Sequence, residues 1–320
     1  VAAYVGLRAL LGHRARCRPR EPGNSREPPR ANLLSRHSSG LKRMQQTTQR
    51  YRAGMPQLAY TGLSENWLIK ECGHRHWEAL AENAGRRAPD FVDDGGSKSY
   101  AAFTAIRLTG ATLHAIGEND AFELGTELCR TGPARHFSRH RLVSGNGECA
   151  LVSMSSTFVR RHEVRNNRSV TRATFAAMAG PTTTPPADAV DMGWRGKQFR
   201  AGQWDERLPF TRADRVESDW IEFLPCPNND FNGADFLYFA SFQSFVDRAE
   251  WQRHRFNEPP VISGRELFFY GNINVGDTLG LRVVAEHKDE RGLAHWCELR
   301  RGSDQQKIAD VVTSKHWRQR

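Results

Sequence analysis

The hydrophobic pattern predicts two long helices that resemble each other in sequence. The first runs from Gly62 to about Ala84, and the second runs from Gly233 to about Trp251. On the first helix, one face is marked by five side chains at every fourth position: Leu68, Cys72, His76, Leu80 and Ala84. The second helix is apolar on nearly all sides between Phe236 and Phe245, which indicates that it is enclosed by other elements.

Alternating apolar and polar residues predict strands after each helix. In the first half, the alternation covers residues 122–128 and 150–157. In the second half, strands are predicted over residues 219–224, 266–270, 279–285, 294–300 and 308–317. Each half also has a similar turn that leads into a strand, at Ile116–Asp120 and at Ile273–Asp277.

The spacing of these elements indicates an internal repeat. Gly62 lies 58 residues before Asp120, whereas Gly233 lies 44 residues before Asp277, and the difference equals the length of the charged loop 85–98. The repeat predicts an α+β fold of the double hot-dog type, with two central helices that are each wrapped by an antiparallel sheet. The expected organisation is a disordered basic tail (1–52), a first hot-dog unit (53–179), a linker and irregular crossover (180–215) and a second hot-dog unit (216–320).

The charge distribution argues against nucleic-acid binding by the folded part. The 320 residues carry a formal net charge of +10, but residues 1–52 alone hold 12 of the 46 Lys and Arg residues and two of the 36 Asp and Glu residues. The other 268 residues therefore carry 34 basic and 34 acidic side chains. A neutral body lacks the excess of cations that binding to a phosphate backbone requires.

The remaining composition indicates a soluble protein in a reducing compartment, which we expect to be the cytoplasm. No apolar run approaches the length of about 18–20 residues that a membrane helix needs. The six Cys residues are widely spaced and form no CxxC motif, and the histidine pairs 74/76 and 136/140 have no completing ligands nearby, so no metal site is predicted. The Arg- and Pro-rich tail resembles a transit peptide, although Met44 or Met55 could be the natural start.

Candidate chemistry gathers at the predicted start of each central helix. The first N–H groups of a helix are unpaired and lie at its positive end, so they can stabilise negative charge on a thioester oxygen. We therefore expect Gly62 and Gly233 to bind substrate, with Asp230 and Asn232 as catalytic candidates beside the second helix. Asp235 stands where hot-dog hydratases carry a catalytic His, which weakens a hydratase assignment. Asp230 could act as in hot-dog thioesterases, or it could only cap the turn together with Asn232.

Several segments together resemble the LnmK family, the bifunctional acyltransferase/decarboxylases of polyketide biosynthesis named from the leinamycin pathway. They are Gly54-Met-Pro56, a Trp-containing helix, Tyr100-Ala-Ala-Phe-Thr-Ala-Ile-Arg107 and Asp230-Phe-Asn-Gly-Ala-Asp-Phe-Leu-Tyr-Phe-Ala240. The resemblance covers residues 53–320. It implies a double hot dog that takes methylmalonyl from coenzyme A, releases CO2 and delivers propionyl to the phosphopantetheine arm of an acyl carrier protein. It implies no cofactor besides the coenzyme A thioester, which is the substrate.

The same resemblance implies a tyrosine that carries the acyl group or handles the enolate. Tyr100 matches this tyrosine by its position before the first long strand, and Tyr60 is the alternative. A phenol needs a nearby cation or base to react at neutral pH, so Arg107, His74 and His76 are candidates, with Arg107 and His76 expected in the substrate site. Because His76 lies on the apolar face of its helix, the alternative is a buried, hydrogen-bonded core histidine. Three functions follow as expectations: decarboxylating acyl transfer, thioester hydrolysis through Asp230, or carrier-protein binding without catalysis.

Overall fold

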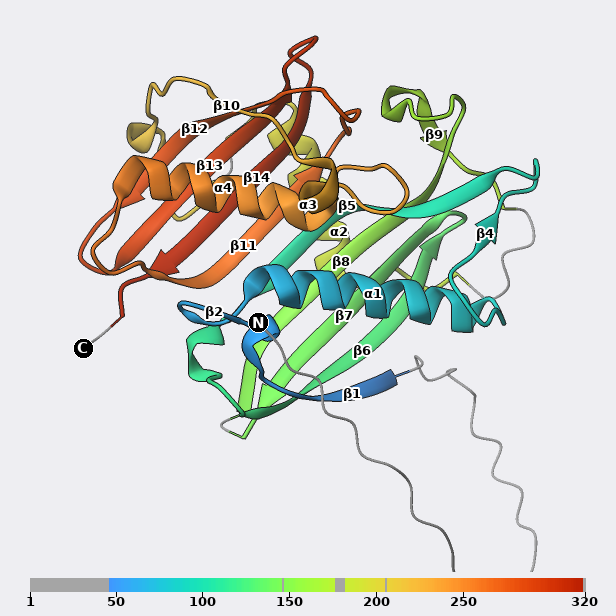
Figure 1. The fold of residues 1–320 in the computed structure, drawn as a ribbon, viewed down its shortest axis with the longest axis horizontal. Coiled ribbons are helices and arrows are strands. Elements are labelled where there is room, and N and C mark those ends of the chain that lie inside the picture. The colour runs from blue at the N-terminus through green and yellow to red at the C-terminus, as the bar shows by residue number, and fades with distance from the viewer. Residues whose placement is uncertain (1–45, 146, 176–181, 205, 319–320) are drawn as a thin grey trace, which may run out of the picture. The chain divides into compact units, whose positions relative to one another are not determined.

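The computed structural model describes residues 46–145, 147–175, 182–204 and 206–318, all within one compact unit. Its main element is an antiparallel sheet of 12 strands with helices on both faces (Figure 1). Along the sheet the order is β1-β6-β7-β8-β5-β11-β14-β13-β12-β10, with β4 paired to β5 and β9 paired to β8. Two further short strands, β2 and β3, pair with each other.

The first half of the chain supplies β1 (Gln46–Arg52), β2 (Leu58–Ala59), β3 (Gly62–Leu63), α1 (Glu65–Asn83), β4 (Phe91–Val92), β5 (Lys98–Thr109), β6 (Ala121–Gly132), β7 (Arg135–Ser144), β8 (Gly147–Arg161) and β9 (Val170–Arg172). The second half supplies α2 (Ala187–Arg200), β10 (Ile221–Phe223), α3 (Pro227–Asp230), α4 (Phe239–His254), β11 (Val261–Phe269), β12 (Leu279–Lys288), β13 (Gly292–Arg301) and β14 (Lys307–His316). Short 3-10 turns lie at Met55–Gln57, Leu113–Ala115, Asn167–Ser169 and Arg212–Asp214.

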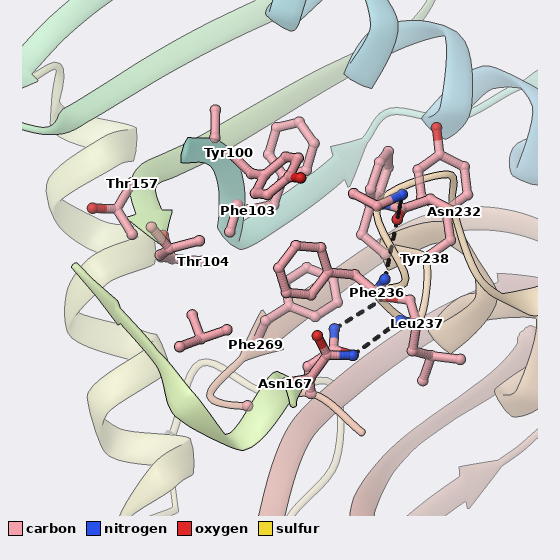
Figure 2. A pocket seen from close by; sticks show the side chains of 18 of the residues that line it. Tyr100, Phe103, Thr104, Thr157, Asn167, Asn232, Phe236, Leu237, Tyr238 and Phe269 are labelled. Atoms are coloured by element: carbon pink, nitrogen blue, oxygen red, sulfur yellow. Dashed lines mark hydrogen bonds between the residues drawn. The ribbon is translucent and has the colours of Figure 1, made fainter. Parts of the chain in front are cut away.

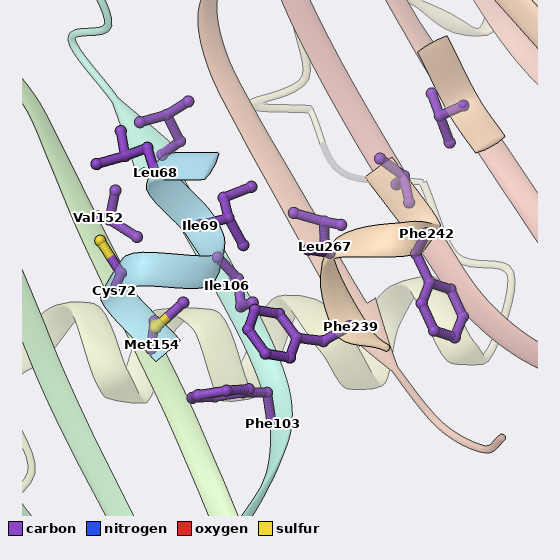
Figure 3. Packing of buried hydrophobic residues seen from close by; sticks show 14 of the residues in the cluster. Leu68, Ile69, Cys72, Phe103, Ile106, Val152, Met154, Phe239, Phe242 and Leu267 are labelled. Carbon is purple, nitrogen blue, oxygen red and sulfur yellow. The ribbon is translucent and has the colours of Figure 1, made fainter. Parts of the chain in front are cut away.

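The two predicted central helices are confirmed as α1 and α4, which lie on the same face of the sheet (Figure 1). The predicted apolar face of α1 is buried against β5 and β8, where Cys72 and Leu68 pack near Met154 and Val152 (Figure 3). Each fully buried aliphatic side chain of this core contributes about 1.5–3 kcal/mol. Two helices, each covered by its own stretch of antiparallel sheet, constitute a double hot-dog fold.

The two halves share one continuous sheet because β5 pairs with β11. Leu108 lies opposite Arg265 and Ile106 lies opposite Leu267 in this antiparallel ladder. Both α1 and α4 pack over this central region and contact each other there. At the contact, Gly73 of α1 faces the ring of Phe239, and a Cβ at position 73 would lie 2.4 Å from the Cζ atom of that ring.

The crossover between the halves differs from the prediction. Residues 187–215 were expected to be irregular, but Ala187–Arg200 forms α2, which packs on the face of the sheet opposite α1 and α4. Met192 and Phe199 are buried in a second core under α2, together with Phe268 and Trp296. Residues 182–186 lead into this helix, and residues 180–181 of the predicted linker lie outside the described residues.

Part of the predicted disordered tail is a strand. Residues 46–52, which we expected within it, form β1 and pair with β6 from Glu127 to Ala121. Tyr51 of this strand stacks on Phe122, so the edge strand is tied to the core. The rest of the predicted tail, residues 1–45, lies outside the described residues. Within the described parts of the chain, no helix is both long enough and apolar enough to cross a membrane.

Candidate functional site

The start of α4 is shaped by a turn that delays the helix. We expected this helix to begin at Gly233, but it begins at Phe239, six residues later. The reason is that the Asn232 side chain accepts hydrogen bonds from the N–H groups of Ala234 (3.0 Å) and Phe236 (3.1 Å), which holds the backbone in a turn that competes with helix formation. No side chain caps the N-terminus of α4, so its first N–H groups are open to another acceptor.

A cavity of about 820 Å³ lies at the start of α4, and we call it the α4 pocket. Tyr100 from β5, Asn232 and Gly233 all line it, so the structure brings these three predicted site residues together in one cavity. Figure 2 shows Tyr100 and Asn232 in its wall. Aromatic side chains form much of its wall: Trp77, Phe103, Phe236, Tyr238, Phe239 and Phe269. Such a cavity can hold an apolar acyl group with its carbonyl near the helix start.

Tyr100 lies half-buried in the wall of the α4 pocket. Its ring meets the ring of Phe236 edge-on at 5.5 Å between centroids. The guanidinium of Arg161 lies 5.9 Å from the Tyr100 ring and 4.2 Å from the Phe236 ring. Arg161 is therefore the cation that the structure places beside Tyr100, and sequence reasoning did not find it.

Arg107, in contrast, does not line the α4 pocket. Its side chain points to the face of the sheet that carries α2, where it binds Glu266 (2.6 Å) and Asp191 of α2 (2.5 Å). It lines neither of the two pockets described here, so the expectation that Arg107 binds substrate is not met. The arginines that do line the α4 pocket are Arg168, Arg172 and Arg301.

His76 is buried between α1 and the sheet, and it does not line either pocket. Its ring nitrogens bond to the hydroxyls of Ser138 (2.7 Å) and Ser156 (2.8 Å). Ser138 also bonds to His140, which in turn bonds to Thr126. Burial lowers the pKa of His76 well below its usual value and that of His140 to about 3, so both rings stay neutral at working pH. This network explains the histidine on the apolar face of α1 as a core residue.

Asp230 supports the turn and does not line the α4 pocket. Its carboxylate accepts a hydrogen bond from the Cys226 N–H at 2.7 Å. Its backbone carbonyl accepts hydrogen bonds from the Tyr238 N–H (2.7 Å) and the Ser241 hydroxyl (3.0 Å). These are the contacts of a residue that shapes the entry to a helix, which was one of the two roles considered for it.

Two asparagines that the sequence did not single out hold this turn in place. Asn272 bonds to both the N–H (2.9 Å) and the carbonyl (3.1 Å) of Leu237. The Asn167 side chain donates to the carbonyls of Asp235 (2.6 Å) and Ile273 (2.7 Å). Both asparagines line the α4 pocket and join segments that are 35 to 106 residues apart, so no local motif could have revealed them.

Gly62 lies just before α1 and lines neither the α4 pocket nor the second cavity found at the start of that helix. It adopts a φ of 116°, and a Cβ there would lie 2.6 Å from the Leu113 carbonyl oxygen. The neighbouring Tyr60 and Thr61 line this second cavity of about 570 Å³, which we call the α1 pocket. Tyr60 is 82% exposed at its mouth, so the two tyrosines considered for the chemistry lie in different pockets.

The floor of the α1 pocket is a cluster of charged side chains. Glu65, Asp247, Glu250 and Lys315 line it, and Arg265 lies buried directly behind. Arg265 binds Glu65 at 2.7 Å and Asp247 at 2.7 Å, and Lys315 binds Glu250 at 2.6 Å. Among the described residues, no group of three or more His, Cys, Asp or Glu side chains is arranged to hold a metal ion.

Three solved structures with the same fold carry thioesterase names, although their sequences are very different from this one. An acyl-ACP thioesterase from Bacteroides thetaiotaomicron matches with a TM-score of 0.56 and 8% identity, over 85% of this chain and 98% of that one. An oleoyl thioesterase from Lactobacillus plantarum matches with a TM-score of 0.55 and 10% identity, over 87% of this chain and 99% of that one. The 12:0-ACP thioesterase from Umbellularia californica matches with a TM-score of 0.52 and 11% identity, over 85% and 94%. At these identities the likeness establishes the hot-dog fold alone. No protein-family model and no curated protein matches the sequence.

Proposed function

We propose that this protein is an enzyme that binds acyl thioesters in the α4 pocket and acts on them. The observation that carries the proposal is the position of this pocket, at the uncapped start of α4 and between the two halves, with Tyr100 and Asn232 in its wall. N–H groups at a helix start stabilise the negative charge that develops on a thioester oxygen. The aromatic wall supplies a dry place for the acyl group.

The substrates that fit are acyl groups on coenzyme A or on the phosphopantetheine arm of an acyl carrier protein. Arg168, Arg172 and Arg301 line the α4 pocket, whereas no carboxylate does so among the described residues. Arg168 is paired with Asp277 (3.0 Å) and Arg301 with Asp304 (2.7 Å), so Arg172 is the one of the three that we expect to attract the phosphate groups that both carriers bear. Two of the structures with the same fold act on acyl-ACP, which supports a carrier protein as the partner.

The comparisons support hydrolysis as the reaction better than the decarboxylating acyl transfer that the resemblance to the LnmK family implies. All three solved structures described above are thioesterases. Hydrolysis needs a group that orients or deprotonates water. The α4 pocket offers no carboxylate and no imidazole among its described lining residues. If hydrolysis occurs, the group that accepts the proton of water is therefore not one of the described lining residues of the α4 pocket.

Decarboxylating acyl transfer is the second candidate, and one observation favours it. Loss of CO2 from a malonyl-type thioester needs an enolate-stabilising donor and a desolvated place for the departing carboxylate, but no general base. The α4 pocket, with its helix start, its aromatic wall and no described acid–base side chain, meets these requirements. In this reaction Tyr100, beside Arg161, would receive the acyl group or stabilise the enolate.

One experiment separates these reactions. The protein is incubated with malonyl-, methylmalonyl- and medium-chain acyl-coenzyme A, and separately with the same acyl groups on a carrier protein. Mass spectrometry then follows free acid, CO2 and acylated carrier. Free acid without a carrier indicates hydrolysis, and carrier with a shortened acyl group indicates decarboxylating transfer. No product with any of these thioesters would contradict the proposal of an enzyme and leave a binding role.

A further inference from the structure

The α4 pocket is lined by side chains from both faces of the sheet. Phe103 of β5 points to the face that carries α1 and α4, where its ring lies 4.6 Å from that of Phe239 between centroids. On the neighbouring β8, Ser156 binds His76 of α1, so the next residue, Thr157, points to the face that carries α2. Phe103, Phe239 and Thr157 nevertheless line the same cavity. The α4 pocket therefore passes through the sheet.

The opening in the sheet lies where β5 and β11 separate. The ladder between these strands ends at the pair formed by Ala105 and Phe268. Directly beyond this pair, β5 has a bulge between Phe103 and Ala105, and a bulge bends the strand that carries it. Residues 99–104 of β5 and residues 269–272 then both line the pocket. The pocket thus occupies the space in which the two strands no longer pair.

The two ends of the α4 pocket differ in polarity and in exposure. At the start of α4 the wall is apolar and buried, with Phe103 and Phe239 only 7% and 8% exposed. At the face that carries α2, Thr104 is exposed and Thr157 is half-buried, and both line the pocket (Figure 2). The pocket therefore has a dry end that suits an acyl group and a polar mouth that suits a hydrated chain.

Arg172 supplies a positive charge at this mouth. It lies on β9 opposite Val159, which is two residues after Thr157 on β8, so it points to the same face of the sheet as Thr157. Its side chain is exposed and lines the pocket. Within the described ranges it takes part in no ion pair, unlike the other two arginines of the lining. A free guanidinium in this position can bind a phosphate group through charge-assisted hydrogen bonds.

We propose that the phosphopantetheine arm of the substrate enters the α4 pocket from the face that carries α2. The arm passes Thr104 and Thr157 with its phosphate at Arg172, and it crosses the sheet where β5 and β11 separate. The acyl group then reaches the start of α4 on the other face. Coenzyme A and carrier proteins both bear this phosphate, so the arm takes the same path from either source. This inference rests on the proposed action on acyl thioesters.

The first test narrows the mouth and measures binding, so that it does not depend on turnover. The ligand is a non-hydrolysable acyl-coenzyme A analogue, and calorimetry gives its Kd. Thr104→Trp is expected to raise the Kd at least about tenfold, because the new ring and the arm cannot occupy the mouth together.

Thr109→Trp is the matched control for this variant. Thr104 and Thr109 are both exposed on β5, and the hydroxyl of each donates to a backbone carbonyl of β8, at Ser155 and Leu151. Thr109, however, lines neither pocket. Its replacement should keep the Kd within about twofold, as is usual for a surface substitution. The melting temperatures of both variants show whether they fold.

A second test removes the charge at the mouth with Arg172→Gln. Three ligands with the same acyl group are compared: the coenzyme A analogue, its counterpart on a carrier protein, and an acyl-pantetheine that lacks the phosphate. The Kd should rise about two- to fivefold for the first two ligands, which is the range of an exposed ion pair, and stay unchanged for the third. Arg212→Gln is the control, because Arg212 is also exposed but lines neither pocket.

The results separate this inference from the proposed function. Wild-type affinity in folded Thr104→Trp would overturn the inference. So would an Arg172→Gln variant that binds all three ligands as the wild type does, or that loses affinity equally with and without the phosphate. A loss confined to coenzyme A would assign Arg172 to the nucleotide part, and a loss confined to the carrier would assign it to the carrier surface; either would also overturn it. A wild type that binds none of the three ligands would instead contradict the proposed function.

Discussion

Acidification is expected to destabilise the protein well before its surface carboxylates titrate, because three histidines are buried in neutral form. His76, His136 and His140 are each at most 6% exposed. Burial lowers their pKa values, to about 4 for His136 and about 3 for His140, and well below the usual range for His76. In the unfolded chain each would titrate near 6.5. The contribution of these histidines to the free energy of unfolding is therefore fully present above pH 6.5. It is lost as the pH drops from 6.5 toward their pKa values in the folded state.

The size of the loss follows from proton linkage. Each histidine that takes up a proton only on unfolding contributes about 1.4 kcal/mol per pH unit, so three contribute about 4 kcal/mol per unit well below pH 6.5. Asp310 acts in the opposite direction, because burial raises its pKa to about 6 and its protonation then favours the folded state below that pH. After this offset, we expect a net loss of about 2–3 kcal/mol between pH 6 and pH 5. That is a large part of the total stability of about 5–15 kcal/mol typical of a folded protein.

Urea unfolding followed by tryptophan fluorescence at pH 7, 6 and 5 measures this slope. In His140→Asn the slope between pH 6 and pH 5 should fall by about half, because one histidine contributes about 1.2 kcal/mol to the net loss of about 2–3 kcal/mol. His162→Asn is the matched control, since His162 is an exposed histidine of the same half, and it should leave the slope unchanged. A free energy of unfolding that stays constant from pH 7 to pH 5 would refute the reasoning.

Three further predictions follow from the same contacts. Gly73→Ala should destabilise the fold by about 1–3 kcal/mol in thermal unfolding, because the new Cβ meets the ring of Phe239. The same variant should prefer shorter acyl chains, because that ring is pushed toward the α4 pocket. An unchanged chain-length profile would argue against this placement of the acyl group. Arg265→Met should cost about 3–5 kcal/mol, because it leaves the buried Glu65 carboxylate without its cation and removes one of the two cations beside Asp247; a change below about 1 kcal/mol would show that Glu65 is solvated. If decarboxylating transfer occurs, Tyr100→Phe should reduce carrier acylation at least about 100-fold while Tyr60→Phe keeps it within about twofold; the reverse order would assign the chemistry to Tyr60.

The sequence predicts the architecture well where one face of an element is apolar. The stripe on α1 and the alternation in β6 and β8 gave the right elements, because side chains on one side of each must be buried. β7 was missed because the side chains it turns toward α1 include His136, Ser138 and His140, which read as surface residues in a sequence. α2 was missed because few of its side chains are buried, and because Gly196 lets it approach Phe268 closely without an apolar side chain of its own.

The candidate site was predicted only in part. Tyr100, Asn232 and Gly233 meet in one pocket, which local motifs and the resemblance to a known family indicated. Arg107 was misplaced, because a sequence shows on which element a polar residue lies but not whether a partner satisfies it across the sheet. His76 is the buried, hydrogen-bonded histidine that was the alternative to a substrate-binding role. The hydrogen bonds of Asn167 and Asn272 and the charged floor of the α1 pocket depend on contacts between distant segments. The spacing of residues within one segment of the sequence does not reveal such contacts.

The most direct test of the account is a crystal structure of the protein with a non-hydrolysable acyl-pantetheine analogue, in which a methylene group replaces the thioester sulfur. The account predicts that the analogue occupies the α4 pocket, with its carbonyl oxygen within hydrogen-bonding distance of the first N–H groups of α4 and its acyl chain against Phe103 and Phe239. Saturating analogue that leaves this pocket empty, or that binds there with the acyl chain directed to solvent, would contradict it.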